Sequence, residues 1–99
     1  MNDEKITLYI NNMFEMPPVS RAQAKSICEN LDQFGEIEFD FNGVDFVSPS
    51  FAHEIFFVFA NAHPGLKLTP INMNDNVRKM YVNAIVKKVN TTSKTADNQ

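Results

Sequence analysis

Three segments of the chain alternate apolar and polar residues, the pattern of a β-strand with one buried and one polar face. Residues 6–10 alternate β-branched and aromatic side chains with polar ones, and residues 66–71 follow the same pattern with Pro70 near the end. In residues 36–41, acids alternate with large hydrophobic residues, which a helix would not keep on one face. This segment is therefore predicted to be a strand whose second face, left uncovered by helices, carries Glu36, Glu38 and Asp40.

The first of three predicted helices covers residues 21–33 and follows a loop that contains two prolines. Ser20 with Gln23 three residues later is the capping-box pattern, in which the hydroxyl and the amide each bind a free backbone N–H group at a helix start. Apolar residues recur at helical steps through this segment, and Cys28 is one of them. Cys28 is therefore interpreted as a small buried side chain rather than a reactive thiol.

A second helix is predicted over residues 49–62. Ser48 followed by Pro49 is a typical helix start, because serine caps the free amides and proline loses no hydrogen bond at the first helical position. Val58 follows the apolar helical period and is expected on the inner face of this helix, and Phe56 and Phe57 widen its apolar stripe. Two interpretations follow: one of these rings belongs to an exposed patch that a partner covers, or it makes a deeper core contact.

A short apolar run over residues 44–47 follows the turn signal Asn42-Gly43 and is interpreted as an additional strand. A third helix is expected over residues 75–89, with two lysines in its last turn. The order of elements is then strand, loop, helix, strand, strand, helix, strand, helix. Strands that alternate with helices indicate an α/β domain built on a central sheet.

The composition is that of one small globular domain. Of the 99 residues, 43% are hydrophobic and 21% charged, and no run approaches the length of a membrane span. A single domain is therefore predicted over residues 1–89, and the polar residues 90–99 are expected to form a disordered tail. The polar start of the chain and its one cysteine favour a cytoplasmic protein that does not bind a membrane. A net charge of −3 argues against direct nucleic-acid binding.

The sequence holds no residue combination typical of a catalytic, metal or phosphate-binding site. His53 and Glu54 are adjacent but lack the second histidine that zinc hydrolases carry four residues later, and the three glycines are isolated. We therefore expect no metal, no cofactor and no enzymatic activity. The His53-Glu54 pair is interpreted as a solvated polar strip of the second helix that a partner could contact.

Four blocks of the sequence carry a family resemblance: Ser20–Lys25, Glu38–Val44, Ser50–Ile55 and Pro70–Asn74. They resemble the STAS-like domain family, small prokaryotic or phage proteins of unknown function related to anti-sigma-factor antagonist domains. The resemblance extends over residues 19–84. It implies a four- or five-stranded mixed sheet with about three helices packed mainly on one face. It also implies a non-enzymatic regulatory module that binds another protein, by analogy an ATPase or kinase of the GHKL type.

One position departs from the pattern of the anti-sigma-factor antagonists, which carry a phosphorylatable serine or threonine at the turn between strand and helix. Here that turn reads Ser48-Pro49-Ser50, and Pro49 stands at the phosphoacceptor position without a hydroxyl group. Ser48 and Ser50 are the displaced candidates for phosphorylation, with helix capping as the alternative role. The predicted partner-binding residues lie at this turn and at the starts of the first two helices: Arg21, Ser48, Ser50, Phe51, His53 and Glu54.

Two alternatives remain open at this stage. The chain could be an acidic phage or mobile-element protein that inhibits a nucleic-acid-binding machine of its host, with acids that imitate phosphates: Glu36, Glu38, Asp40 and Asp45. The second alternative is a domain that binds a small ligand or catalyses a reaction, which ligand-dependent thermal stabilisation would reveal. The sequence leaves the oligomeric state open.

Overall fold

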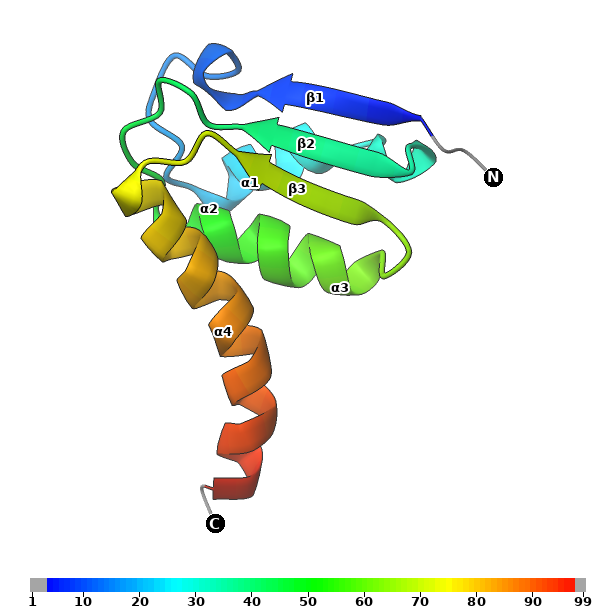
Figure 1. Cartoon of the computed structure of the whole chain (residues 1–99), viewed down its shortest axis with the longest axis vertical. Helices are drawn as coiled ribbons and strands as arrows, with labels where there is room; N and C mark the ends of the chain where they lie inside the picture. Colours follow the sequence, from blue (N-terminus) through cyan, green and yellow to red (C-terminus); the bar gives the residue numbers. More distant parts are fainter. Residues whose placement is uncertain (1–3, 98–99) are drawn as a thin grey trace.

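The computed structural model describes the backbone of residues 4–97 and the side chains of residues 4–86. Its centre is a parallel sheet of three strands in the order β1 (Lys5–Tyr9), β2 (Glu36–Asp40) and β3 (Lys67–Ile71), shown in Figure 1. The three strands are in register, so that residues of one row share a face of the sheet. The three segments with alternating polarity are therefore confirmed as strands.

The expected count of four or five strands is not confirmed, and within the described residues the sheet is parallel rather than mixed. The apolar run 44–47, predicted to be a strand, is a loop. It starts with a tight turn, in which the Val44 N–H group donates to the Phe41 carbonyl at 2.9 Å and Gly43 has a φ of +83°. The Asn74 side chain donates to two carbonyl oxygens of the loop, so these groups are satisfied without a neighbouring strand.

The first predicted helix is shorter than expected. α1 (Arg21–Cys28) ends where Asn30 adopts a left-handed conformation with a φ of +64°. A separate 3₁₀ turn, η2 (Leu31–Gln33), then leads into β2. The apolar period continued through residues 31 and 34, and this hid the break, because asparagine reaches the left-handed region without an obvious sequence signal.

The second predicted helix runs over residues 49–62 as three connected parts: α2 (Pro49–His53), η3 (Glu54–Phe59) and α3 (Ala60–Ala62). The middle part is a π-helix, whose wider turns change which side chains face inward. Val58, expected on the inner face, is 43% exposed, whereas Phe56 is buried and packs edge-to-face against Phe39 and Tyr81. Of the two readings of Phe56, the core contact is correct.

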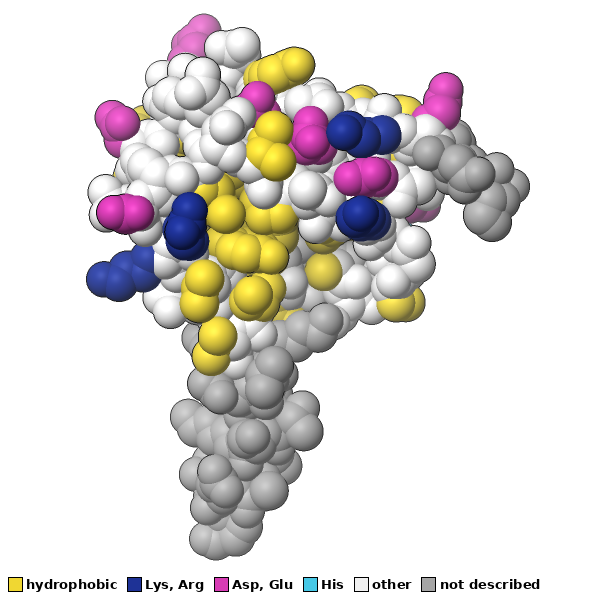
Figure 2. Space-filling view, viewed as in Figure 1, with side chains coloured by type: hydrophobic (Ala, Val, Ile, Leu, Met, Phe, Trp, Pro, Cys, Tyr) yellow, Lys and Arg dark blue, Asp and Glu magenta, His cyan; other side chains and the backbone are white. Residues whose placement is uncertain are grey.

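The helices leave one face of the sheet uncovered. On the covered face, Ile37 and Phe39 of β2 are fully buried against the helices. On the other face, the acids of β2 lie between the side chains of β1 and β3. In Figure 2 this uncovered face is turned toward the viewer, with lysine and acidic side chains next to one another over the strands. The predicted one-sided arrangement is therefore confirmed for the part of the chain that the structure describes.

The last helix, α4 (Asp75–Asp97), starts with an asparagine cap, since the Asn74 side-chain oxygen accepts from the Val77 N–H group at 2.8 Å. Its first turns pack against α2 and η3, and Figure 1 shows it continuing past the sheet. The side chains beyond residue 86 lie outside the described part, so the expected disordered tail over residues 90–99 stays a prediction. Among the described residues, no helix combines the length and apolar character needed to cross a bilayer.

Candidate functional site

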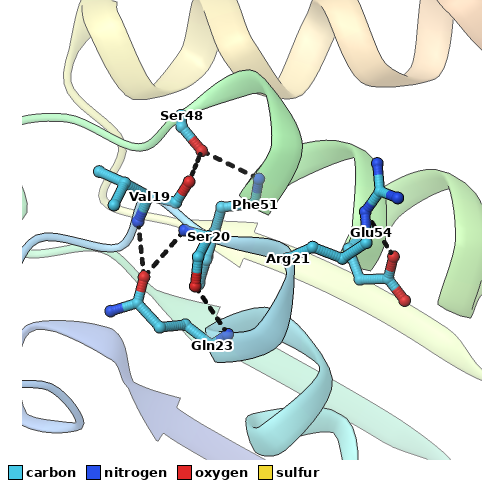
Figure 3. Close-up of polar contacts among 7 residues, drawn as sticks. All are labelled: Val19, Ser20, Arg21, Gln23, Ser48, Phe51 and Glu54. Carbon is cyan, nitrogen blue, oxygen red and sulfur yellow. Dashed lines mark hydrogen bonds and ion pairs between the residues drawn. The ribbon is translucent and has the colours of Figure 1, made fainter.

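The starts of α1 and α2 lie beside each other and are tied together by Ser48 (Figure 3). The Ser48 hydroxyl accepts from the Phe51 N–H group at 3.1 Å, which caps α2, and donates to the carbonyl oxygen of Val19. The Ser48 N–H group donates to the Pro18 carbonyl at 3.1 Å. One residue therefore caps one helix and holds the segment that leads into the other.

The start of α1 is fixed by a complete capping box (Figure 3). The Ser20 hydroxyl accepts from the Gln23 N–H group at 3.1 Å, and the Gln23 side-chain oxygen accepts from the N–H groups of Ser20 and Val19 at 2.9 and 2.8 Å. The Gln23 side-chain nitrogen also donates to the Pro17 carbonyl at 3.1 Å. These bonds confirm the predicted capping box and give the loop before α1 one defined conformation.

Arg21 and Glu54 join the two helices a little further along. The Arg21 Nε atom lies 3.5 Å from a Glu54 carboxylate oxygen, and Figure 3 shows the end of the guanidinium group pointing away from that carboxylate. The Arg21 side chain is 59% exposed, but the Glu54 side chain is only 8% exposed. The interpretation of Glu54 as part of a solvated strip is therefore wrong, because α1 packs over this part of the second helix and buries the carboxylate under Arg21.

Cys28 is buried, as predicted. Burial, together with the smaller effect of the nearby negative charge of Glu54, raises the pKa of the Cys28 thiol from 9.0 to about 12. A thiol with such a pKa is almost entirely protonated at neutral pH. It is therefore a weak nucleophile and a poor metal ligand.

The predicted partner-binding residues fall into two groups. Arg21 and Ser50 are exposed, and His53 is half-buried with its ring edge-on against Phe57 at 4.6 Å. Phe51 is fully buried and Glu54 nearly so, which contradicts the prediction that these two side chains contact a partner directly. Ser48 is half-buried, and its hydroxyl oxygen already accepts the hydrogen bond that caps α2.

The two candidate phosphoacceptors differ in accessibility. A phosphate on Ser48 would remove the hydroxyl proton that is donated to the Val19 carbonyl and would place charged oxygens against that carbonyl. Ser50 is exposed in the first turn of α2, four residues before Glu54 and so on the same side of the helix. Ser50 is the candidate that can be modified without breaking a contact that builds the site.

Sequence reasoning missed a group of exposed apolar side chains beside these helix starts. Met16 is 65% exposed, Phe46 is 45% exposed, and Val19 is also exposed next to the Ser48 bond. Met16 and Phe46 line a pocket of about 340 Å³ between the loop before α1 and the loop after β2. We call Met16, Val19, Arg21, Phe46 and Ser50 the helix-start surface. The available signal was apolar residues inside two loops, where no core-facing period accounts for them.

The other residues considered for chemistry are dispersed. Asp45 lies in the loop after β2 and so is not part of the row of acids on that strand. His63 packs its ring on Phe59 at the far end of the second helix, with Nδ1 3.2 Å from the Phe59 carbonyl. Residues 4–86 contain no group of three or more histidine, cysteine or acidic side chains arranged to hold a metal.

A family model described as a STAS-like domain of unknown function matches residues 23–78, more than half of the chain. The matched stretch runs from the capping glutamine of α1 through the second helix and β3 into the first turn of α4. It includes Phe46, Ser50 and Glu54 from the site described above. Comparison with curated proteins and with solved structures finds no match.

Proposed function

Because the chain belongs to the STAS-like domain family, we propose that it is a regulatory module that binds another protein and catalyses no reaction. The observation that carries this proposal is the helix-start surface. It combines exposed apolar side chains with a backbone that is already fixed by caps before a partner arrives. A surface that needs no ordering on binding loses less conformational entropy, which favours specific association.

The chemistry of the helix-start surface resembles that of a protein interface. Methionine, phenylalanine and arginine are enriched where proteins meet, and a few residues in well-packed pockets supply most of the binding energy of an interface. Met16 and Phe46 line such a pocket, and Arg21 lies at the neighbouring helix start. The partner is expected to insert an apolar side chain between the two loops and to place an acidic group against Arg21.

The partner that we propose is an ATPase or kinase of the GHKL type, by analogy with the anti-sigma-factor antagonists that the family resembles. Phosphorylation of Ser50 would provide the off switch. A phosphate in the first turn of α2 is favoured by the helix dipole and would attract the Arg21 guanidinium away from Glu54. That rearrangement would change both the charge and the shape of the helix-start surface.

The alternative of an acidic inhibitor of a nucleic-acid-binding machine has less support. A phosphate mimic needs acids that are free to meet cations, but Glu36 and Glu38 accept bonds from threonines and Glu38 also pairs with Lys5 at 3.2 Å. Asp40 accepts from Asn42 and Asn72. The acidic row therefore resembles an internally paired sheet face rather than a binding surface.

The proposal is tested by affinity capture from a lysate of the organism that encodes the chain. The wild type is compared with the double variant Met16→Asp, Phe46→Asp. The matched control, Val82→Asp with Val86→Asp, places the same charges on two exposed apolar residues of α4. The proposal expects one ATP-hydrolysing protein to be retained by the wild type and the control and lost with the surface variant.

A captured candidate is then purified, and its affinity for the chain and its ATP hydrolysis rate are measured directly. The chain is expected to bind it and change that rate, and Ser50→Asp is expected to weaken binding at least tenfold. The location of the surface is refuted if the double variant binds as well as the wild type. The regulatory role is refuted if binding leaves the rate of ATP hydrolysis unchanged.

A further inference from the structure

The outer edge of β1 presents backbone hydrogen-bonding groups. The Glu4 carbonyl accepts from the N–H groups of Gly35 and Glu36 at 2.9 and 3.2 Å, so Glu4 faces β2. Backbone groups of successive strand residues point to opposite sides. Lys5, Thr7 and Tyr9 therefore direct their N–H and carbonyl groups outward, where the described residues supply no further strand.

The outer edge of β3 differs from the edge of β1. The Lys67 N–H group donates to the Gly35 carbonyl and the Ile71 carbonyl accepts from Phe41, so the backbone groups of these two residues face β2. By alternation, the residues of β3 whose backbone groups point outward are Leu68 and Pro70. Proline has no N–H group, and its place on an outer edge blocks continuation of the ladder there. β1 contains no proline and no bulge, so it is the edge that can accept another strand.

The sequence of β1 is complementary to itself in the antiparallel direction. When two copies pair about a two-fold axis at Thr7, Lys5 faces Tyr9 of the second copy and Ile6 faces Leu8 of the second copy. All three kinds of cross-strand pair are favourable: lysine beside an aromatic ring, two aliphatic residues opposite each other, and threonine opposite threonine. The register places no two like charges opposite each other.

The charges of the sheet favour this edge over the uncovered face as a contact between copies. Two sheets stacked on their uncovered faces would bring the acids of one β2 against those of the other in either two-fold orientation. Edge pairing keeps the two acidic rows apart, with both β1 strands between them. The charge of Lys5 at the edge is already compensated by Glu38.

We propose that the outer edge of β1 is an interface for a second copy of this chain, which pairs with it antiparallel about Thr7. The two sheets then become one continuous sheet with the β1 strands at its centre. A two-fold axis perpendicular to the sheet keeps the helices of both copies on the same face. Both helix-start surfaces lie at the carboxyl ends of the strands and stay accessible, so this inference is independent of the proposed function.

The interface is small, since β1 has five residues. A contact of this size is well below the roughly 1,600 Å² of a standard stable interface, so the dimer is expected to dissociate on dilution. Sedimentation velocity over a concentration series measures this. The wild type is expected to move from the mass of one chain toward twice that mass as its concentration rises.

Thr7→Lys is the informative variant, because it places two lysines directly opposite each other at the axis and repels the second copy. Thr69→Lys is its matched control. Thr7 and Thr69 flank Glu38 in the same row, and both donate to an acid of β2, at 3.0 and 3.1 Å. The first variant is expected to sediment as a single chain at every concentration, and the second as the wild type does.

A second measurement does not depend on how well the lysine variant folds. Paired residues at the axis have Cα atoms about 5.5 Å apart, which a disulfide can bridge. Thr7→Cys is expected to form a covalent dimer under mild oxidation at least tenfold faster than Thr69→Cys, while Cys28 stays buried and protonated. The proposal is overturned if the wild type stays a single chain throughout, if both lysine variants associate equally, or if both cysteine variants cross-link at the same rate.

Discussion

Ile37 and Phe39 of β2 lie fully buried under the helices, whereas Glu36 and Glu38 of the same strand lie on the open side and accept hydrogen bonds from Thr69 and Thr7. The two faces thus hold the same strand by different means. The covered face is stabilised by close packing of apolar side chains away from water. Shortening one of these side chains leaves a cavity that water does not fill. The open face relies on polar pairs that water can replace, so each of its contacts contributes little.

The largest difference in stability loss is expected between variants of two neighbouring residues of β2, Phe39 and Glu38. Phe39→Ala leaves a cavity next to the ring of Phe56, which packs on it at 5.5 Å, and should lower the free energy of unfolding by about 3–5 kcal/mol. Glu38→Ala removes surface contacts and should cost less than about 1 kcal/mol. Urea unfolding followed by circular dichroism measures both, and equal losses would contradict the distinction between the faces.

Removing one partner of the Arg21–Glu54 ion pair should lower the free energy of unfolding substantially, as a core truncation does, because Glu54 is buried. Arg21→Ala leaves the buried carboxylate of Glu54 without its cation and should cost about 2 kcal/mol, more than Arg78→Ala on the exposed side of α4. Glu54→Met replaces the carboxylate with an apolar side chain of similar size and should be neutral or stabilising. The same unfolding measurement applies, and a larger loss for Glu54→Met than for Arg21→Ala would show that the pair stabilises the fold.

The face pattern also explains which features the sequence could predict. The strands follow from alternation over five or six residues, and the helix starts from serine caps with Gln23 or Pro49 beside them, because these signals are local. The loop at residues 44–47 has the composition of a strand. It is excluded from the sheet by the turn at Gly43 and by Asn74, which lies far along the chain.

The burial of Glu54 and the exposure of Phe46 could not be read from the sequence for a related reason. Both depend on how segments distant in the chain pack together: α1 over the second helix in the first case, and two loops beside each other in the second. The π-helix turns the second helix enough to exchange Val58 for Phe56 in the core. Periodicity based on a regular α-helix predicts Val58 on the inner face and leaves the position of Phe56 open.

Ser48 and Ser50, at the border between the covered layer and solvent, should differ by a smaller amount. Ser48→Ala removes the cap of α2 and the tie to Val19, and should cost about 1 kcal/mol. Ser50→Ala changes an exposed side chain in the first turn and should leave the unfolding midpoint unchanged. Thermal unfolding of the two variants measures this, and equal midpoints would mean that the cap contributes no stability.

The smallest effects are expected on the open face, where Thr7→Val and Thr69→Val keep the β-branched shape and remove one hydroxyl each. Each should cost less than about 0.5 kcal/mol in dilute solution, because water can replace a hydrogen bond to a carboxylate that remains partly exposed. The contacts of the two threonines also determine which of the two variants should lose more stability. Glu38 keeps its ion pair with Lys5 when Thr7 changes, whereas Glu36 receives its hydrogen bond from Thr69. Thr69→Val should therefore cost more than Thr7→Val, and high salt, which screens the Lys5 charge, should narrow the difference.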